Sequence, residues 1–150
     1  MAATSEAMID RLVTILAIVG TEYTLTSRVT LGHVAEAPPS APWVTLAVSG
    51  LTSKADDSAT SLSKWRFSLR VEIEGWVAGV TDTPDGRLRA ALRLLSDITA
   101  AIGADRSLGA RCIDVVPELT ALDGDAHGLP PGYGFVAGTL VIDYHTTGRS

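Results

Sequence analysis

Every second residue between Trp65 and Ile73 is apolar, and this alternation constrains the fold more than any other feature of the chain. The apolar positions are Trp65, Phe67, Leu69, Val71 and Ile73, and the polar positions are Arg66, Ser68, Arg70, Glu72 and Glu74. Side chains on a β-strand point alternately to its two faces. The pattern therefore predicts a strand with one face on the core and a polar opposite face.

Trp76 lies just beyond this run, and its parity leaves two interpretations open. If the alternation continues, Trp76 falls on the polar face, where an exposed tryptophan suggests a contact with another protein. If Gly75 carries a β-bulge, the register is reset and Trp76 belongs to the core.

Two segments show the three- and four-residue spacing of amphipathic helices. The first covers residues 5–19 and ends at Gly20. The second begins at Thr83-Pro84-Asp85, where a hydroxyl can cap the first turn and proline suits the first helical position, and it ends at Gly103. The expected buried residues are Met8, Leu12, Ile15, Leu16 and Val19 in the first helix, and Leu88, Ala91, Leu92, Leu95, Ile98 and Ile102 in the second.

Runs of β-branched, aromatic or alternating residues predict four further strands. They cover residues 29–34, 43–49, 111–116 and 134–146. Pro117 ends the third of these, which fits an edge strand or a strand end. The Ser- and Thr-rich residues 50–63 are expected to form an exposed loop, and residues 123–132 a polar, turn-rich connection.

The predicted element order is α-β-β-β-α-β-β, which indicates the α+β class. We expect a mainly antiparallel sheet of four to five strands with two amphipathic helices packed on one face. A length of 150 residues favours a single domain over residues 1–150.

The charge of the chain limits its partners. It carries 12 basic and 17 acidic residues, a net charge of −5, which disfavours tight binding of duplex DNA but lets DNA pass close by.

The apolar run 12–19 is far shorter than the ~20 residues of a membrane span, and the N-terminus lacks the basic start of a signal peptide. We expect a cytoplasmic, reducing environment.

The sequence holds no nucleophile-elbow, dinucleotide-binding or Walker A motif. The single Cys112 excludes an intrachain disulfide, and its apolar context indicates an inert thiol. Asp123, Asp125 and His127 alternate and could hold a divalent ion, although a solvated loop is the favoured interpretation. We therefore predict no enzymatic activity, no metal and no cofactor.

A charged stripe follows four-residue steps on the second predicted helix, through Asp85, Arg89, Arg93 and Asp97. Such stripes are usually solvated, and each pair contributes only a few tenths of a kcal/mol. The alternative interpretation is a charged contact between subunits.

The order of these elements resembles that of the tail terminator proteins of long-tailed phages, the lambda-type minor tail protein U group, and of related tail-completion proteins. The resemblance covers nearly the whole chain. It is carried by the helix 8–19, the proline-containing approach to a strand at 41–46, the Ser/Asp-rich loop before the alternating strand 65–73, the helix 84–103, and an Asp/Gly loop before the closing strand that ends at 140–144.

This resemblance implies a structural protein of the virion tail and neck that is assembled in the host cytoplasm. It implies a homo-oligomer, a hexameric ring on the end of the tail tube. There the ring would stop polymerisation of the tube protein and offer a docking surface to the head connector or head-completion protein. DNA would pass through its lumen without specific binding, and no enzymatic activity or cofactor is implied.

On this interpretation, contacts with neighbouring proteins fall on exposed loops, the polar strand face and the charged helix stripe. The candidates are Asp56, Asp57, Arg66, Arg70, Trp76, Arg89, Arg93, Asp123 and Asp125, and each competes with a plain solvated surface. Two alternatives remain: a head–tail connector or head-completion ring protein, and a small hydrolase or ligand-binding domain that uses His127 or His145.

Overall fold

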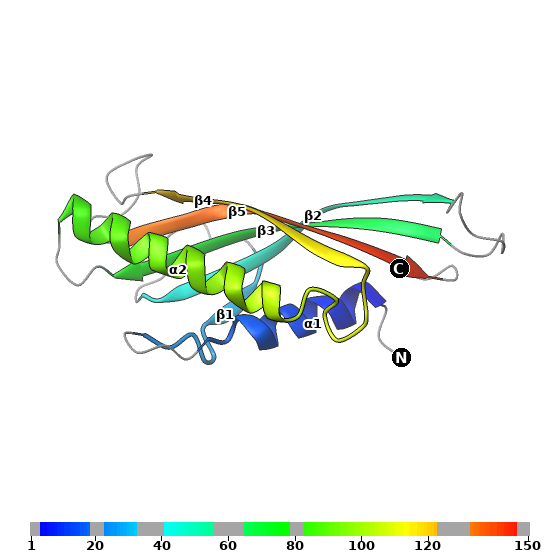
Figure 1. Ribbon diagram of the computed structural model, residues 1–150, viewed down its shortest axis with the longest axis horizontal. Coiled ribbons are helices and arrows are strands. Elements are labelled where there is room, and N and C mark those ends of the chain that lie inside the picture. Colours follow the sequence, from blue (N-terminus) through cyan, green and yellow to red (C-terminus); the bar gives the residue numbers. More distant parts are fainter. Residues whose placement is uncertain are drawn as a thin grey trace.

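A computed structural model of the chain describes residues 4–18, 23–32, 41–55, 65–78, 83–122 and 133–146. It contains a five-stranded sheet with strand order β1-β2-β3-β5-β4 and two helices on one side of that sheet (Figure 1). The elements are α1 (Thr4–Leu16), β1 (Val29–Leu31), β2 (Trp43–Ala55), β3 (Trp65–Ala78), α2 (Pro84–Ala104), β4 (Asp114–Leu122) and β5 (Tyr133–Thr146). The predicted class and element order are confirmed.

Most of the sheet is antiparallel, as predicted. β3 lies between β2 and β5 and is antiparallel to both, and β4 is antiparallel to β5. The short β1 is parallel to β2, which makes the sheet mixed. The core lies between this sheet and the helices.

The alternating segment forms β3, and its apolar positions Leu69, Val71 and Ile73 are buried on the face covered by the helices. The neighbouring strand β5 presents a matching row on the same face, because each of these residues pairs in register with a residue of β5. The buried residues of that row are Val136, Leu140, Ile142 and Tyr144.

Helix α2 begins where the sequence predicts. The hydroxyl of Thr83 accepts a hydrogen bond from the backbone N–H of Gly86, and Pro84 occupies the first helical position. Helix α1 ends at Leu16, short of the predicted end, and residues 19–22 lie outside the described part of the chain.

The buried side of α2 differs from the predicted stripe. Ala91, Ile98 and Ile102 are buried as expected, but Leu88 and Leu92 are exposed, Leu92 to 48%. The helix is rotated so that Ala91 and Leu94 face the sheet, where both are completely buried. The prediction for Leu88 and Leu92 was wrong because a neighbouring stripe of α2 is buried instead, which consists of Arg87, Ala90, Ala91, Leu94, Ile98 and Ile102.

Two glycines on the sheet permit this close packing. A Cβ atom at Gly134 of β5 would clash with the backbone carbonyl oxygen of Arg87 and lie 3.1 Å from the backbone nitrogen of Ala91. A Cβ atom at Gly75 of β3 would lie 3.0 Å from Cδ2 of Leu94. The backbone of α2 therefore rests almost directly on the backbone of β5.

Two strands extend beyond their predicted limits. β2 continues through Gly50 to Ala55, so the loop prediction for residues 50–55 was wrong; residues 56–64 lie outside the described ranges. A register shift between Val48 and Gly50 accommodates one extra residue, Ser49. The alternation in β2 is broken at this bulge, which explains why the pattern ended early.

β4 passes through the proline that was expected to end it. Pro117 lies within the strand and pairs in register with Leu140 of β5. β4 is an edge strand, and an edge tolerates a residue without a backbone N–H. Of the two interpretations of Pro117, an edge strand and a strand end, the structure shows the edge strand, and the strand limits 111–116 were wrong.

Replacing Gly134 with alanine is expected to destabilise the protein by about 1–3 kcal/mol, because α2 must move away from β5. Urea unfolding of the Gly134→Ala variant measures this change. The matched control is Gly103→Ala in α2, where a Cβ atom meets nothing within 4 Å and a gain of roughly 0.4–1 kcal/mol is expected. Equal stability of the wild type and Gly134→Ala would show that the close helix contact is not a constraint.

Candidate functional site

The sheet face turned away from α1 and α2 is named here the outer face. Gly75 faces α2, so its neighbours on β3, Glu74 and Trp76, lie on the outer face. By the same alternation Arg66 and Arg70 share that face, as the sequence predicts.

Trp76 matches neither of its two interpretations. The pairing of β3 with β2 and β5 shows no register shift at Gly75, so no bulge brings Trp76 to the helix side. Trp76 is nevertheless only 3% exposed. Its ring packs against Phe135 of β5 at a centroid distance of 5.4 Å, and Trp43 of β2 lies opposite it in register. Trp76 is therefore buried on the outer face beside Phe135, and the interpretation as an exposed contact residue was wrong.

The middle of the outer face carries charges of both signs. Nη2 of Arg66 lies 3.5 Å from Oδ2 of Asp143 on β5, and Arg70 is exposed on the same face. Glu72 and Glu74 continue the row toward Trp76. This mixed surface fits a protein contact better than a phosphate track, because a phosphate track needs clustered basic residues.

The charged stripe of α2 divides into two parts with different roles. Nε of Arg89 lies 2.8 Å from Oδ2 of Asp85 in an exposed pair one helical turn apart, which contributes little to stability. Asp97 instead accepts a hydrogen bond from the hydroxyl of Tyr23 and so ties α2 to the segment before β1. Arg93 is exposed. Arg89 and Arg93 thus lie on the surface of α2, as do the exposed Leu88 and Leu92.

The loop candidates Asp56, Asp57, Asp123 and Asp125 lie outside the described residues, as does His127. Within the described ranges, no three His, Cys, Asp or Glu side chains are grouped as metal ligands. His145 lies on β5, opposite Arg66 in register.

Charged residues after α2 hold the turn into β4. Asp105 accepts hydrogen bonds from the Gly109 backbone N–H and from Arg11 of α1; these bonds, the one from Gly109 foremost, lower the pKa of Asp105. A two-pronged hydrogen bond from Arg106 likewise lowers the pKa of Asp114. These carboxylates are therefore structural ties between the helices and the sheet edge.

Cys112 lies in this turn, just before β4, and its Sγ is 3.4 Å from the carbonyl oxygen of Arg106. Burial, followed by the charges of Asp114, Asp105 and Asp143, raises the pKa of the thiol to about 11. The thiol is therefore protonated at neutral pH, and a protonated thiol is a poor nucleophile.

Cys112 is expected to react with iodoacetamide at pH 8 at least roughly tenfold more slowly in the folded protein than in the urea-unfolded chain, where the thiol regains its ordinary pKa. Mass spectrometry of the alkylated protein over time measures both rates. Equal rates would contradict the raised pKa of the thiol.

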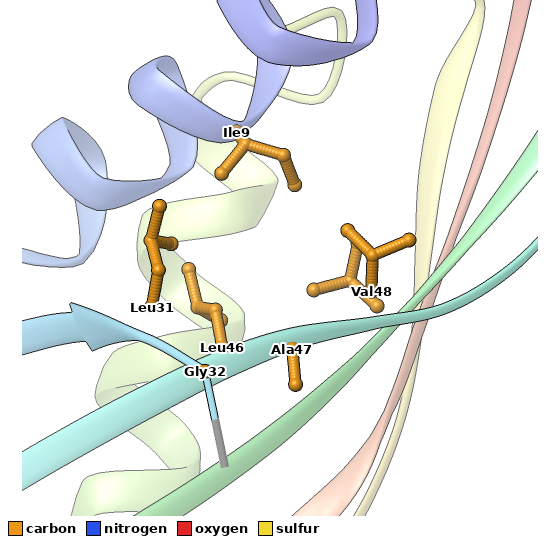
Figure 2. Close-up of a pocket in the computed structure, with 7 residues that line it drawn as sticks. Ile9, Leu31, Gly32, Leu46, Ala47 and Val48 are labelled. Atoms are coloured by element: carbon orange, nitrogen blue, oxygen red, sulfur yellow. The ribbon is translucent and has the colours of Figure 1, made fainter.

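One surface was missed by the sequence analysis. Ile9 of α1, Leu31 and Gly32 at the end of β1, and residues of β2 and β3 line an apolar pocket of about 230 Å³. Figure 2 shows Ile9, Leu31 and Val48 pointing into this space from three elements, while Ala47 points away from it. The pocket opens at the sheet edge, where Leu31 and Val48 are exposed to 59% and 56%. The signal that could have found it is Val48, which continues the apolar row of β2 past Leu46, the last residue that pairs with β1.

Comparison with known proteins gave no match, either to a protein-family model or to a curated protein. Neither described helix has the length and apolar character that crossing a membrane would require.

Proposed function

We propose that this chain is a structural protein of a long-tailed phage virion, a tail terminator that assembles into a ring on the end of the tail tube. The ring ends polymerisation of the tube protein and presents its other side to the head connector or head-completion protein. It acts through surface complementarity and not through catalysis.

The observation that carries this proposal is the extension of the sheet past its helices. β2, β3 and β5 continue beyond the N-terminal start of α1 in Figure 1, so part of the sheet lies outside the region that the helices cover. Exposed apolar residues lie on this extension and elsewhere, with Val48 and Leu51 on β2 and Leu88 and Leu92 on α2. Apolar surface on several sides of one small domain suits a subunit that contacts more than one neighbour.

The resemblance in element order to tail terminators supports the same function, since the observed order is the one on which the resemblance was based. The hexameric stoichiometry comes from the resemblance alone. The net charge of −5 is compatible with a lumen through which DNA passes without sticking.

The purified protein is expected to bind the ends of tail tubes, polymerised from the tube protein of the same phage, as a ring about six times the monomer mass. Sedimentation with and without tubes, together with electron microscopy of tube ends, measures this association. Tube length in mixed polymerisation should fall as the ratio of this chain to tube protein rises. A protein that stays monomeric and never binds tube ends would contradict the proposal.

A pull-down distinguishes the proposed function from its nearest alternative. Binding to the portal-side protein without binding to the tube protein would identify a head–tail connector or head-completion ring protein.

A further inference from the structure

Most of β2 forms an open edge of the sheet. β1 covers only its start: the N–H of Val44 donates to the carbonyl of Arg28, and the N–H of Gly32 donates to the carbonyl of Leu46. The β1–β2 register ends at Leu46, and no other strand in the described ranges pairs on this side. The N–H and C=O groups of every second residue of β2 point to this side, as those of Val44 and Leu46 do toward β1. Val48 is the next such residue, so its N–H and C=O face the open side. Such an edge is complemented by another extended backbone.

The apolar pocket lies beside this open edge. Val48 and Leu46 belong to the helix-side face of β2, and Ile9 of α1 lies above them (Figure 2). A strand added to the edge would direct every second side chain to this face. The pocket, at about 230 Å³, exceeds the roughly 150 Å³ of a cavity that holds a benzene ring. It therefore accommodates an aliphatic or aromatic side chain of the added strand.

The opposite side chains of an added strand would meet a basic group. Arg70 of β3 pairs in register with Gly50 of β2, and a Cβ atom at Gly50 would meet nothing within 4 Å. Neighbouring strands lie about 4.8 Å apart, so the long side chain of Arg70 can reach over Gly50 toward the edge. In the described part of the chain, no carboxylate pairs with Arg70. A carboxylate on the outer side of the added strand would complement this charge.

We propose that the edge of β2 over residues 47–55 binds an extended segment of a different protein, one that alternates apolar and acidic residues. The apolar side chain enters the pocket formed by Ile9, Leu31 and Val48, and the acidic one pairs with Arg70. This inference deepens the proposed function by naming how a neighbour is held, and it rests on that function for the neighbour's identity.

A second copy of the chain is the less suitable occupant. The second edge strand of the sheet, β4, carries Pro117, which has no N–H to donate. Proline is typical of edge strands that are protected against pairing. Pairing β2 with β2 of a copy would bring two Arg70 side chains toward one junction, where their like charges repel.

The test uses a capped nonapeptide that alternates valine and glutamate, with its binding to the full chain measured by fluorescence anisotropy. The peptide is expected to bind the wild type, and a peptide with lysine in place of glutamate is expected to bind at least tenfold more weakly. Arg70→Glu and Val48→Lys should each weaken binding about tenfold. The matched control Leu92→Lys, at another exposed apolar residue, on α2, should leave binding unchanged.

Backbone amide NMR of the wild type provides a readout that needs no variant. Peptide addition should shift the amide signals of Val48 and Leu51 and leave those of β4 unchanged. No binding, equal binding of the lysine peptide, or equal binding by Arg70→Glu would overturn the inference. Self-association of the wild type that Val48→Lys abolishes would assign the edge to a second copy and overturn it as well.

The outcomes separate this inference from the proposed function. A protein that forms rings on tube ends but ignores the peptide contradicts the strand-binding edge alone. A protein that binds the peptide but never associates with tubes contradicts the tail function alone.

Discussion

The lengths of the elements leave part of the sheet without a helical cover, and the exposed surfaces follow from that mismatch. A 14-residue strand such as β3 spans about 46 Å, whereas α2, with 21 residues, is about 31 Å long. α1 is shorter still, with 13 residues. The two helices cover the central core, and the extensions of β2, β3 and β5 continue past them (Figure 1). Gly134 and Gly75 fix where α2 lies, because only residues without a side chain allow it to approach the sheet so closely.

Local patterns in the sequence predicted the parts of the fold that local physics determines. The alternation through Leu69, Val71 and Ile73 places one face of β3 in the core whatever its partners are. The start of α2 was equally predictable, because the cap at Thr83 and the proline after it act within one turn.

Features that depend on distant partners were not predictable. Leu88 and Leu92 are exposed because α2 is oriented by its contacts with Gly134 and Gly75 on the sheet, which Ala91 and Leu94 make. Trp76 is buried although it lies on the outer face, and its ring neighbour Phe135 comes from far along the chain. The continuation of β2 past Gly50 depends on its pairing with β3, since the segment itself shows no clean alternation.

In the candidate site, too, some features follow from local patterns and others depend on contacts between distant segments. Arg66 and Arg70 lie on the outer face as their parity predicts, while the pocket at Val48 arises only when α1, β1 and β2 come together. The charged groups near the end of α2 support structure: Asp105 and Asp114 hold a turn, and Asp97 binds Tyr23. The surfaces left for partners are an apolar pocket, an open strand edge and a mixed-charge face. Together they suit a protein that works by contact with its neighbours.

The central claim is that the uncovered part of the sheet is where this protein meets those neighbours. Hydrogen–deuterium exchange of the protein alone and bound to the ends of tail tubes tests it most directly. We expect fast exchange of the edge-facing amides of residues 47–55 in the free protein, because those that face β3 are paired, slow exchange in the strands of the core, and at least roughly tenfold slower exchange of the edge-facing amides in the bound state. Unchanged exchange over 47–55 upon binding, with new protection elsewhere, would contradict it.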